Sequence, residues 1–303
     1  MTRLSNINTI LAFVTVAREG SVSRAAEVLN LTQPAVSHQI KRLADEMGLA
    51  LFERTATGLA LSSDGAAILP KAERVLETLA EFRLSARQRS GQLGGRLRVG
   101  TIVDPEFIRL GRLLALLRRE HPAIETELVH GVSGDILSWL RKGRIDAGFY
   151  LCSPDDLPRI DIANGEPITA RKLATFRYHV VGPVGWEAKI AQADWRALAR
   201  LPWIGTPPTS VHNRLLAKVF HHEERQRTVV ARVDQEASML EMVRSGLGLS
   251  LCRDSIALHQ RQTFGLSVCE TVSVPACLCF ITLESRRDIP TIAETFRLLE
   301  QAW

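Results

Sequence analysis

The first ninety residues carry three short segments in which apolar positions recur at helical spacing. In INTILAFVTVAREG they recur every three or four residues, and Gly20 follows as a residue type that ends helices. A nearby serine can cap the shorter second segment, RAAEVLN, and Asn30 after it tolerates a left-handed turn. Thr32 is then a good cap for a third helix, because Pro34 falls in the first turn.

The third helix is predicted to have two unlike faces. Val36, Ile40 and Leu43 lie at helical spacing and are expected to face inward. The positions left outside carry amide, hydroxyl and basic groups: Gln33, Ser37, His38 and Arg42. Two short helices joined by a tight turn, the second with such an outer face, are typical of a helix-turn-helix. These groups can meet bases or phosphates of DNA; a solvated polar face is the alternative.

The next segment, LALFERTATGLALSSDG, indicates two extended runs around the turn-forming pair Thr57-Gly58. We interpret this hairpin as a wing beside the third helix. Arg54 stands at its base, where a cation can reach a phosphate or the minor groove of double-stranded DNA.

A long helix is predicted after the wing, from about residue 64 to residue 90, capped by Ser62 or Ser63. Its apolar positions are spaced four, three, four and three residues apart, which is typical of a coiled-coil seam. The positions that we assign to dimerisation are Ile68, Ala72, Val75, Leu79 and Phe82. Packing against its own domain is the alternative, but no partner segment precedes the break GQLGG, so we expect a partner chain.

Beyond GQLGG, extended apolar segments alternate with amphipathic helical ones, which favours an α/β fold with mostly parallel strands. The element order predicts two lobes, residues 96–165 with 270–303 and residues 166–269, and the chain is expected to cross between them near 163–169 and 266–271. A helix is predicted to begin at EFIRLG, and we expect the final helix, 289–303, to pack on the first lobe. The predicted domains are therefore 1–62, 63–95 and 96–303.

Ligands of such folds bind between lobes, beyond the carboxyl ends of strands. This rule selects loops that contain Asp104, Ser133, Ser210 and Glu236. The two serines are predicted to cap helices, whose free N–H groups suit an anion. Two carboxylates in one pocket repel each other unless a cation neutralises them, and these loops contain no lysine. We therefore expect an effector with an amino group, for example an amino acid whose carboxylate meets a serine. The alternative is that each acid stabilises the start of its own helix.

The bulk composition limits the class of protein. The chain has 303 residues, of which 46% are hydrophobic and 23% charged, and this suits two or more packed, soluble domains. A formal net charge of +5 is compatible with a polyanionic partner. No apolar run approaches the roughly 18 residues of a membrane helix, and the N-terminal segment lacks a cleavage site, so we expect a cytoplasmic protein without a membrane partner.

No pattern supports an enzyme. The sequence has no phosphate-binding glycine loop, no nucleophile elbow and no helical histidine pair with a glutamate. His221 and His222 are adjacent and point in different directions, so they do not predict a metal site. We therefore expect no catalysis, no cofactor and no metal.

Five cysteines are present, and their spacing predicts neither a disulfide framework nor a zinc site. Cys277 and Cys279 alternate with apolar residues in PACLCFITL, as the residues on one face of a buried strand do. Redox sensing through Cys152 or Cys269 is the alternative function that we keep open.

The stretch from Phe13 to Leu76 resembles the DNA-binding half of LysR-type transcriptional regulators. The resemblance rests on SRAAEVL, TQPAVS, LADEMGLALFER and LSSDG, in that order. The rest of the chain is similar to the effector half of that family, a two-lobed domain like a periplasmic binding protein. The resemblance implies a ligand-responsive transcriptional regulator with a winged helix-turn-helix, a long linker helix and an α/β effector domain, assembled as a homodimer or homotetramer.

The resemblance also implies roles for single residues. It places Gln33, Pro34, Ser37 and His38 on the recognition helix and Arg54 at the wing, and with Thr32 and Arg42 these form the candidate DNA-binding set. It assigns effector contacts to Asp104, Ser133, Ser210, Val211, His212 and Glu236.

The chain departs from the family pattern at several of these positions. Many relatives carry arginine in place of His38 and a basic wing tip in place of residues 56–58, so we expect fewer or more pH-sensitive DNA contacts. Relatives often carry serine or threonine in place of Asp104 and an apolar residue in place of Glu236.

Overall fold

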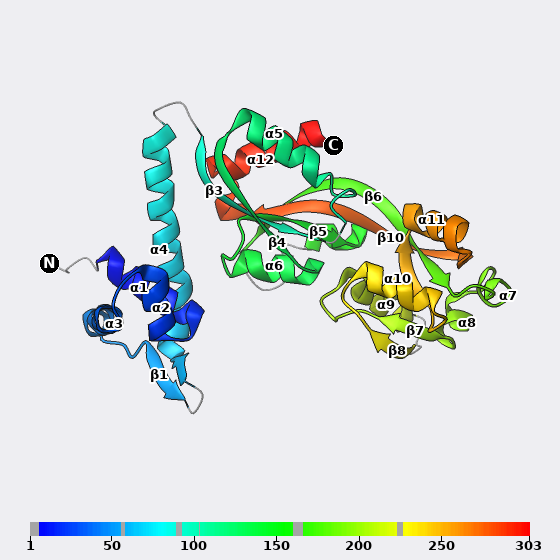
Figure 1. Cartoon of the computed structure of the whole chain (residues 1–303), viewed down its shortest axis with the longest axis horizontal. Coiled ribbons are helices and arrows are strands. Elements are labelled where there is room, and N and C mark those ends of the chain that lie inside the picture. The colour runs from blue at the N-terminus through cyan, green and yellow to red at the C-terminus, as the bar shows by residue number, and fades with distance from the viewer. Residues whose placement is uncertain (1–5, 56–57, 89–92, 103, 160–165, 223–226) are drawn as a thin grey trace. The chain divides into compact units, whose positions relative to one another are not determined.

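The computed structural model describes residues 6–55, 58–88, 93–102, 104–159, 166–222 and 227–303 (Figure 1). The chain divides into two compact units, Met1–Gln92 and Leu93–Trp303, which we describe separately. Within the described residues, no helix is both long enough and apolar enough to span a membrane.

The first unit contains the three helices, the hairpin and the long helix that the sequence predicts. Gly20 and Asn30 end the first two helices in the left-handed conformation, and Ser21 caps the second by accepting from the Arg24 N–H. The elements are α1 (Ile7–Glu19), α2 (Val22–Leu29), α3 (Gln33–Met47), the antiparallel pair β1 (Phe52–Thr55) and β2 (Gly58–Leu61), and α4 (Ser63–Gln88).

Aromatic and aliphatic side chains from all of these elements form the core of the first unit. Phe13 of α1 is fully buried and meets the ring of Phe52 edge to face, with centroids 5.5 Å apart. Val36 and Leu43 fix the inner face of α3, as predicted. The start of α4 packs on the same core, so the hairpin is held between α4 and the helical bundle.

The second unit is built on a six-stranded mixed sheet in the order β4-β3-β5-β10-β6-β9. The strands are β3 (Gly94–Thr101), β4 (Ala123–His130), β5 (Ala147–Cys152), β6 (Ile168–Gly182), β9 (Ser250–Arg253) and β10 (Ser267–Leu283). A separate parallel pair is formed by β7 (Pro202–Gly205) and β8 (Thr228–Arg232). The longer helices are α5 (Leu110–Glu120), α6 (Ser133–Arg141), α9 (Val211–His222), α10 (Glu236–Arg244), α11 (Asp254–Phe264) and α12 (Pro290–Ala302). Short ones are α7 (Glu187–Ile190), α8 (Trp195–Ala199) and the 3₁₀ turns Pro154–Arg159 and Glu284–Arg286.

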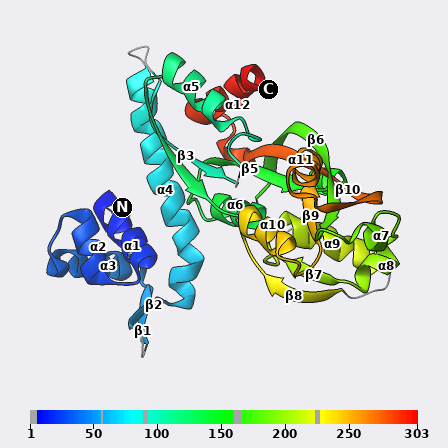
Figure 2. The ribbon, with the colours of Figure 1, turned by 45° about the vertical axis from the view of Figure 1, so that its right-hand side comes forward.

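These elements form two lobes that share the long strands β6 and β10. In the first lobe, α5 and α12 lie together on one side of the sheet and α6 lies on the other (Figure 1), which confirms the predicted place of the final helix. In the second lobe, α9 and α10 flank β7 and β8 (Figure 2).

The crossings between the lobes lie further along the chain than predicted. Residues 277–281 of β10 pair with β5 of the first lobe, and the neighbouring residues of β6 therefore belong there too. Only residues 178–181 of β6 pair with β9 of the second lobe. The strand partners change near residues 176–178 and 273–277, inside two unbroken strands. The sheet also contains antiparallel pairs that the sequence did not indicate: β3 runs parallel to β4 and β5, as expected, but β10 runs antiparallel to both β5 and β6.

Candidate functional site

The outer face of α3 is the first candidate surface. Gln33, Ser37, His38 and Arg42 are all exposed, as predicted, because Val36 and Leu43 occupy the inner face. Thr32 stands at the N-cap position with extended backbone but makes no capping bond with its side chain. Its hydroxyl is therefore not engaged by the helix.

The basic residues of this surface are placed unequally. Arg42 pairs with Glu46 one turn later, with Nε and Oε1 2.9 Å apart, so a DNA phosphate would have to compete with that carboxylate. Arg54 belongs to β1 at the base of the hairpin, and its side chain lies outside the described residues, as does the wing tip at 56–57. Pro34 sits in the first turn of α3 as expected.

The predicted dimerisation seam on α4 splits into two parts. Ile68 and Ala72 pack against the core of their own unit, which is the alternative role that the sequence left open. Phe82 is 70% exposed and Val75 46% exposed. With Leu79 they line an apolar groove that Ile7 of α1 also borders. The exposed part of the seam therefore begins at Val75.

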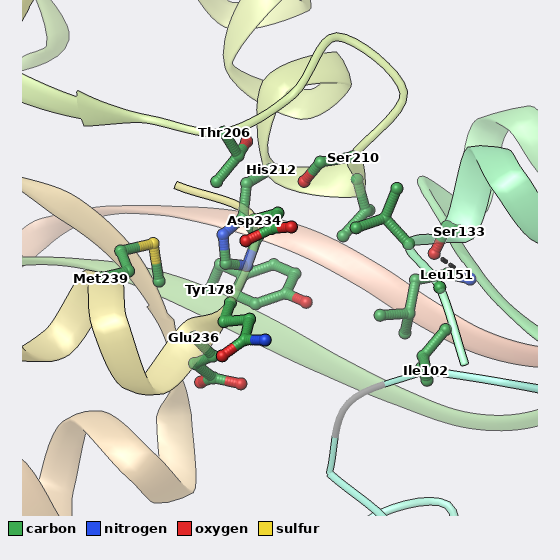
Figure 3. A pocket seen from close by; sticks show the side chains of 14 residues that line it. Ile102, Ser133, Leu151, Tyr178, Thr206, Ser210, His212, Asp234, Glu236 and Met239 are labelled. Carbon is green, nitrogen blue, oxygen red and sulfur yellow. Dashed lines mark hydrogen bonds between the residues drawn. The ribbon is translucent and has the colours of Figure 1, made fainter. Parts of the chain in front are cut away.

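The second candidate site is a pocket between the lobes of the second unit (Figure 3). Its volume is about 80 Å³, against roughly 10–15 Å³ for a single water, so in this conformation it fits a small metabolite. Five of the six predicted effector residues line it together: Ser133, Ser210, Val211, His212 and Glu236. The other lining residues, to which the sequence assigned no effector contact, are Ile102, Gly131, Val132, Leu151, Tyr178, Thr206, Asp234, Gln235 and Met239.

Ser133 does not cap its helix as predicted. Val132 is the residue before α6, and its N–H donates to the Asp135 carboxylate at 3.2 Å. The buried Ser133 hydroxyl instead accepts a 3.0 Å hydrogen bond from the Leu151 N–H of β5 (Figure 3). Its own proton is then free to point at a ligand. Ser210 holds the predicted position before α9, and its backbone carbonyl accepts the Arg214 N–H.

His212 and Tyr178 form the aromatic wall of the pocket. Their rings meet edge to face with centroids 4.5 Å apart. Burial, with a smaller effect of Arg227, lowers the pKa of His212 to about 4. The imidazole is therefore neutral at physiological pH and offers one donor and one acceptor. Burial also raises the pKa of Tyr178, so its hydroxyl remains a donor.

Glu236 is the most informative acid of the pocket. Its Oε1 atom is buried and has no hydrogen-bond partner among the described residues. Burial raises the pKa of this carboxyl, Arg253 opposes the effect and Asp104 adds to it. An unpaired buried carboxylate oxygen is costly, so a ligand that donates to Oε1 would remove that cost.

Asp104 is the predicted effector residue that the structure places elsewhere. Its Oδ1 accepts a 2.9 Å hydrogen bond from the Phe107 N–H, and its Oδ2 pairs with the Arg253 guanidinium. The following residues form a turn rather than the predicted helix start, since α5 begins only at Leu110. Asp104 therefore has its own cation. Arg253 could not be assigned to this pair from the sequence, because it ends β9 and lies outside the predicted pocket loops.

The two lobes are also joined on another side of the pocket. The Gly134 N–H at the start of α6 donates to the Thr209 carbonyl of the second lobe at 3.0 Å. Arg214 of α9 donates to the Leu151 carbonyl at 2.8 Å and to the Tyr150 hydroxyl. Because Thr209 already occupies one N–H at this helix start, the predicted anion site at α6 is partly filled by the protein itself.

Comparisons with known proteins match both units. A family described as bacterial regulatory helix-turn-helix proteins of the lysR family matches residues 7–66, and the LysR substrate binding domain matches residues 90–303. The HTH-type transcriptional regulator CfxR of Cupriavidus necator is 28% identical over 269 residues, which cover 88% of this chain and 79% of CfxR.

Solved structures agree on the architecture. A full-length OxyR of Pseudomonas aeruginosa has a TM-score of 0.71 at 22% identity, with 99% of this chain and 95% of that chain covered. Full-length CbnR in complex with its target DNA has a TM-score of 0.60 at 20% identity, with 98% and 100% covered. At these identities the likeness concerns the fold alone.

Proposed function

The chain belongs to the LysR family of regulators, and we propose how its two units perform the family's function. It is a DNA-binding transcriptional regulator that responds to a ligand. In our proposal, the outer face of α3 reads double-stranded DNA, the exposed part of α4 joins copies of the chain, and the pocket between the lobes holds the effector.

The DNA-binding role rests on the chemistry of α3. Gln33 can pair bidentately with adenine, and Ser37 and His38 can contact bases or phosphates. All three side chains are exposed on one helix face, and Thr32 adds an uncommitted hydroxyl at its start. In this proposal, Arg54 attracts DNA of any sequence by contacting a phosphate. Arg54→Ala should therefore reduce the salt slope, which is the slope of log affinity for DNA against log salt concentration, by about one unit.

We further propose that the effector carries a cationic group, such as an amine. The single observation that carries this is the buried, unpartnered Oε1 of Glu236 in the pocket. Asp234 adds a second acid to the lining, and the described lining includes no lysine or arginine. Asp104 does not add to the negative charge offered to the ligand, because Arg253 already neutralises it. The Ser133 and Ser210 hydroxyls remain able to hold a carboxylate of an amino acid.

A binding experiment on the full chain tests the effector class. Calorimetric titration would use three probe sets: small amino acids, the matching amines without a carboxylate, and the matching carboxylates without an amine. We expect binding only from compounds with the amine. Glu236→Gln should weaken that binding at least about tenfold, since a charge-assisted hydrogen bond contributes roughly 1.5–3 kcal/mol.

Glu241→Gln is the matched control, because Glu241 lies on the same helix but is exposed and pairs with Arg244. It should bind like the unaltered chain. Binding of plain carboxylates with equal affinity by the unaltered chain and by Glu236→Gln would contradict the proposed effector class, while leaving the DNA-binding role untouched.

The alternative of redox sensing has little support in the structure. All five cysteines are buried, whereas redox-sensor thiols are exposed and have low pKa values. We accordingly propose a regulator without catalysis that acts in the cytoplasm, where its DNA would be found.

A further inference from the structure

Three of the five cysteines converge on one face of the sheet in the first lobe. Cys152 ends β5, and Cys277 and Cys279 lie two residues apart on β10, so the latter two share a face. Cys277 is the direct cross-strand partner of Cys152. The sequence could not show this cluster, because it depends on which strand lies beside β10.

The sulfur atoms are spaced as the ligands of one metal ion are. Sγ of Cys277 lies 3.4 Å from Sγ of Cys152 and 3.8 Å from Sγ of Cys279. All three sulfurs lie within 4.8 Å of one another. The point equidistant from the three is therefore no more than roughly 2.4 Å from each, close to a metal–thiolate bond of about 2.3 Å.

Two cations lie near the cluster. Lys172 acts electrostatically on Cys277 and Arg214 on Cys152, whereas Asp156 acts in the opposite direction on Cys277. The two cations can therefore offset part of the negative charge of a metal–thiolate group.

Ordinary packing of buried thiols does not account for this convergence. Cys252 and Cys269 are equally buried, which is common for free cysteine. Cys269 turns its sulfur to Thr271 and to the Ala193 carbonyl, at 3.3 Å and 3.5 Å. Only in the cluster, among the described residues, do three sulfurs meet at one point.

The number of ligands selects the kind of ion. Structural zinc is almost always held by four protein ligands. In the part of the chain that the structure describes, no histidine, carboxylate or other cysteine joins the three sulfurs. Three soft thiolates without a fourth ligand suit Cu(I), a soft monovalent ion that accepts three-coordination.

We propose that Cys152, Cys277 and Cys279 form a three-thiolate binding site for one soft metal ion of the Cu(I) type. Binding would displace the protons that remain on the thiols, so affinity should rise with pH. The site ties the end of β5 to β10 close to the crossing between the lobes. Tyr150, two residues before Cys152, accepts a hydrogen bond from Arg214 of the second lobe.

The test uses the full chain, kept reduced and free of oxygen. One sample is titrated with Cu(I) against a competing chelator, and a second is unfolded and refolded with Cu(I), because a buried site can fill as the chain folds. We expect one ion per chain. Cys277→Ser should weaken binding more than about 100-fold, beyond the 10- to 100-fold loss typical of residues that only support a ligand.

Cys252→Ser is the matched control, since it removes an equally buried thiol outside the cluster and should keep one ion per chain. Cys277→Ala serves if the serine variant does not fold, and X-ray absorption should report three sulfur neighbours. Equal uptake by Cys277→Ser and Cys252→Ser would overturn the site. So would absence of Cu(I) uptake by the unaltered chain in both samples, or a Cys152–Cys277 disulfide after mild peroxide in a chain that binds no Cu(I).

Discussion

The guanidinium of Arg253 pairs with the carboxylate of Asp104 across the two lobes, joining the end of β9 to the turn after β3. The side chains are only 10% and 22% exposed, and the guanidinium lies over the Phe107 ring at 3.7 Å. Asp104 has a φ of 87°, a conformation that non-glycine residues rarely adopt, and its two bonds hold it there. The pair is a structural latch beside the pocket.

Removing the cation of this latch should destabilise the second unit. Arg253→Met leaves the Asp104 carboxylate mostly buried without its partner, and we expect the free energy of unfolding to fall by about 3 kcal/mol. Urea denaturation measures the change. The control is Arg96→Met, which breaks an exposed pair with Glu127 and should cost less than about 1 kcal/mol. Equal losses of unfolding free energy in the two variants would show that the pair of Asp104 and Arg253 stabilises the fold no more than an exposed ion pair does.

Features set by residues close together in the sequence could be predicted, whereas those set by contacts between distant residues could not. Gly20 and Asn30 end helices through their own backbone preferences, so the helix-turn-helix was predictable residue by residue. The exposure of Gln33 and His38 followed from the helical period alone.

Features set by distant partners were not predictable in the same way. Asp104 looked like a free pocket acid because Arg253 is far away in the sequence. Ser133 looked like a helix cap because its true partner, the Leu151 N–H, belongs to a neighbouring strand. The crossings were misplaced because a strand that changes partners shows no break in its apolar pattern.

The stability of the second unit should depend on pH through His212. Its pKa is about 4 in the folded chain, below the ordinary value of 6.5, because burial disfavours the charged ring. The stability that it contributes is present above pH 6.5 and is lost as pH falls towards 4. We expect a loss of about 3 kcal/mol across that window. Thermal unfolding at several pH values measures this effect. His212→Gln should flatten the plot of melting temperature against pH between pH 4 and 6.5, and an unchanged slope of that plot would contradict the assignment.

Gly134 should be essential for the close approach of the two lobes. A Cβ atom at this position would lie 2.5 Å from the Thr209 carbonyl oxygen and 2.6 Å from the Thr209 Cβ. We therefore expect Gly134→Ala to separate the lobes there and to lower the free energy of unfolding by about 1–3 kcal/mol.

Gly111→Ala provides the comparison for Gly134→Ala. Gly111 lies in α5 with nothing within 4 Å of its added Cβ. Alanine should stabilise that helix by up to about 1 kcal/mol. Thermal unfolding of both variants measures the two effects. A Gly134→Ala chain that is more stable than the unaltered one would show that a methyl group fits between α6 and Thr209.

The assembly of the chain should depend on the exposed part of α4. Leu79→Asp would place a charge in the apolar groove that Val75 and Phe82 also line, and we expect it to dissociate the oligomer. Sedimentation velocity at micromolar concentration measures the mass. Thr78→Asp is the control, since Thr78 borders the same groove but lies outside the predicted seam. A Leu79→Asp chain that stays oligomeric would place the interface elsewhere.

The proposed function is tested most directly by measuring how α3 recognises DNA. Duplexes selected by the unaltered chain from a random pool would be compared, by fluorescence anisotropy, with duplexes changed at single base pairs. We expect Gln33→Ala to lose about 1–3 kcal/mol of discrimination at one base pair while keeping the salt slope. Gln262→Ala, an exposed glutamine of the second unit, should behave like the unaltered chain. If Gln33→Ala discriminates between bases as well as the unaltered chain, or weakens all sequences equally, the outer face of α3 does not read DNA as proposed.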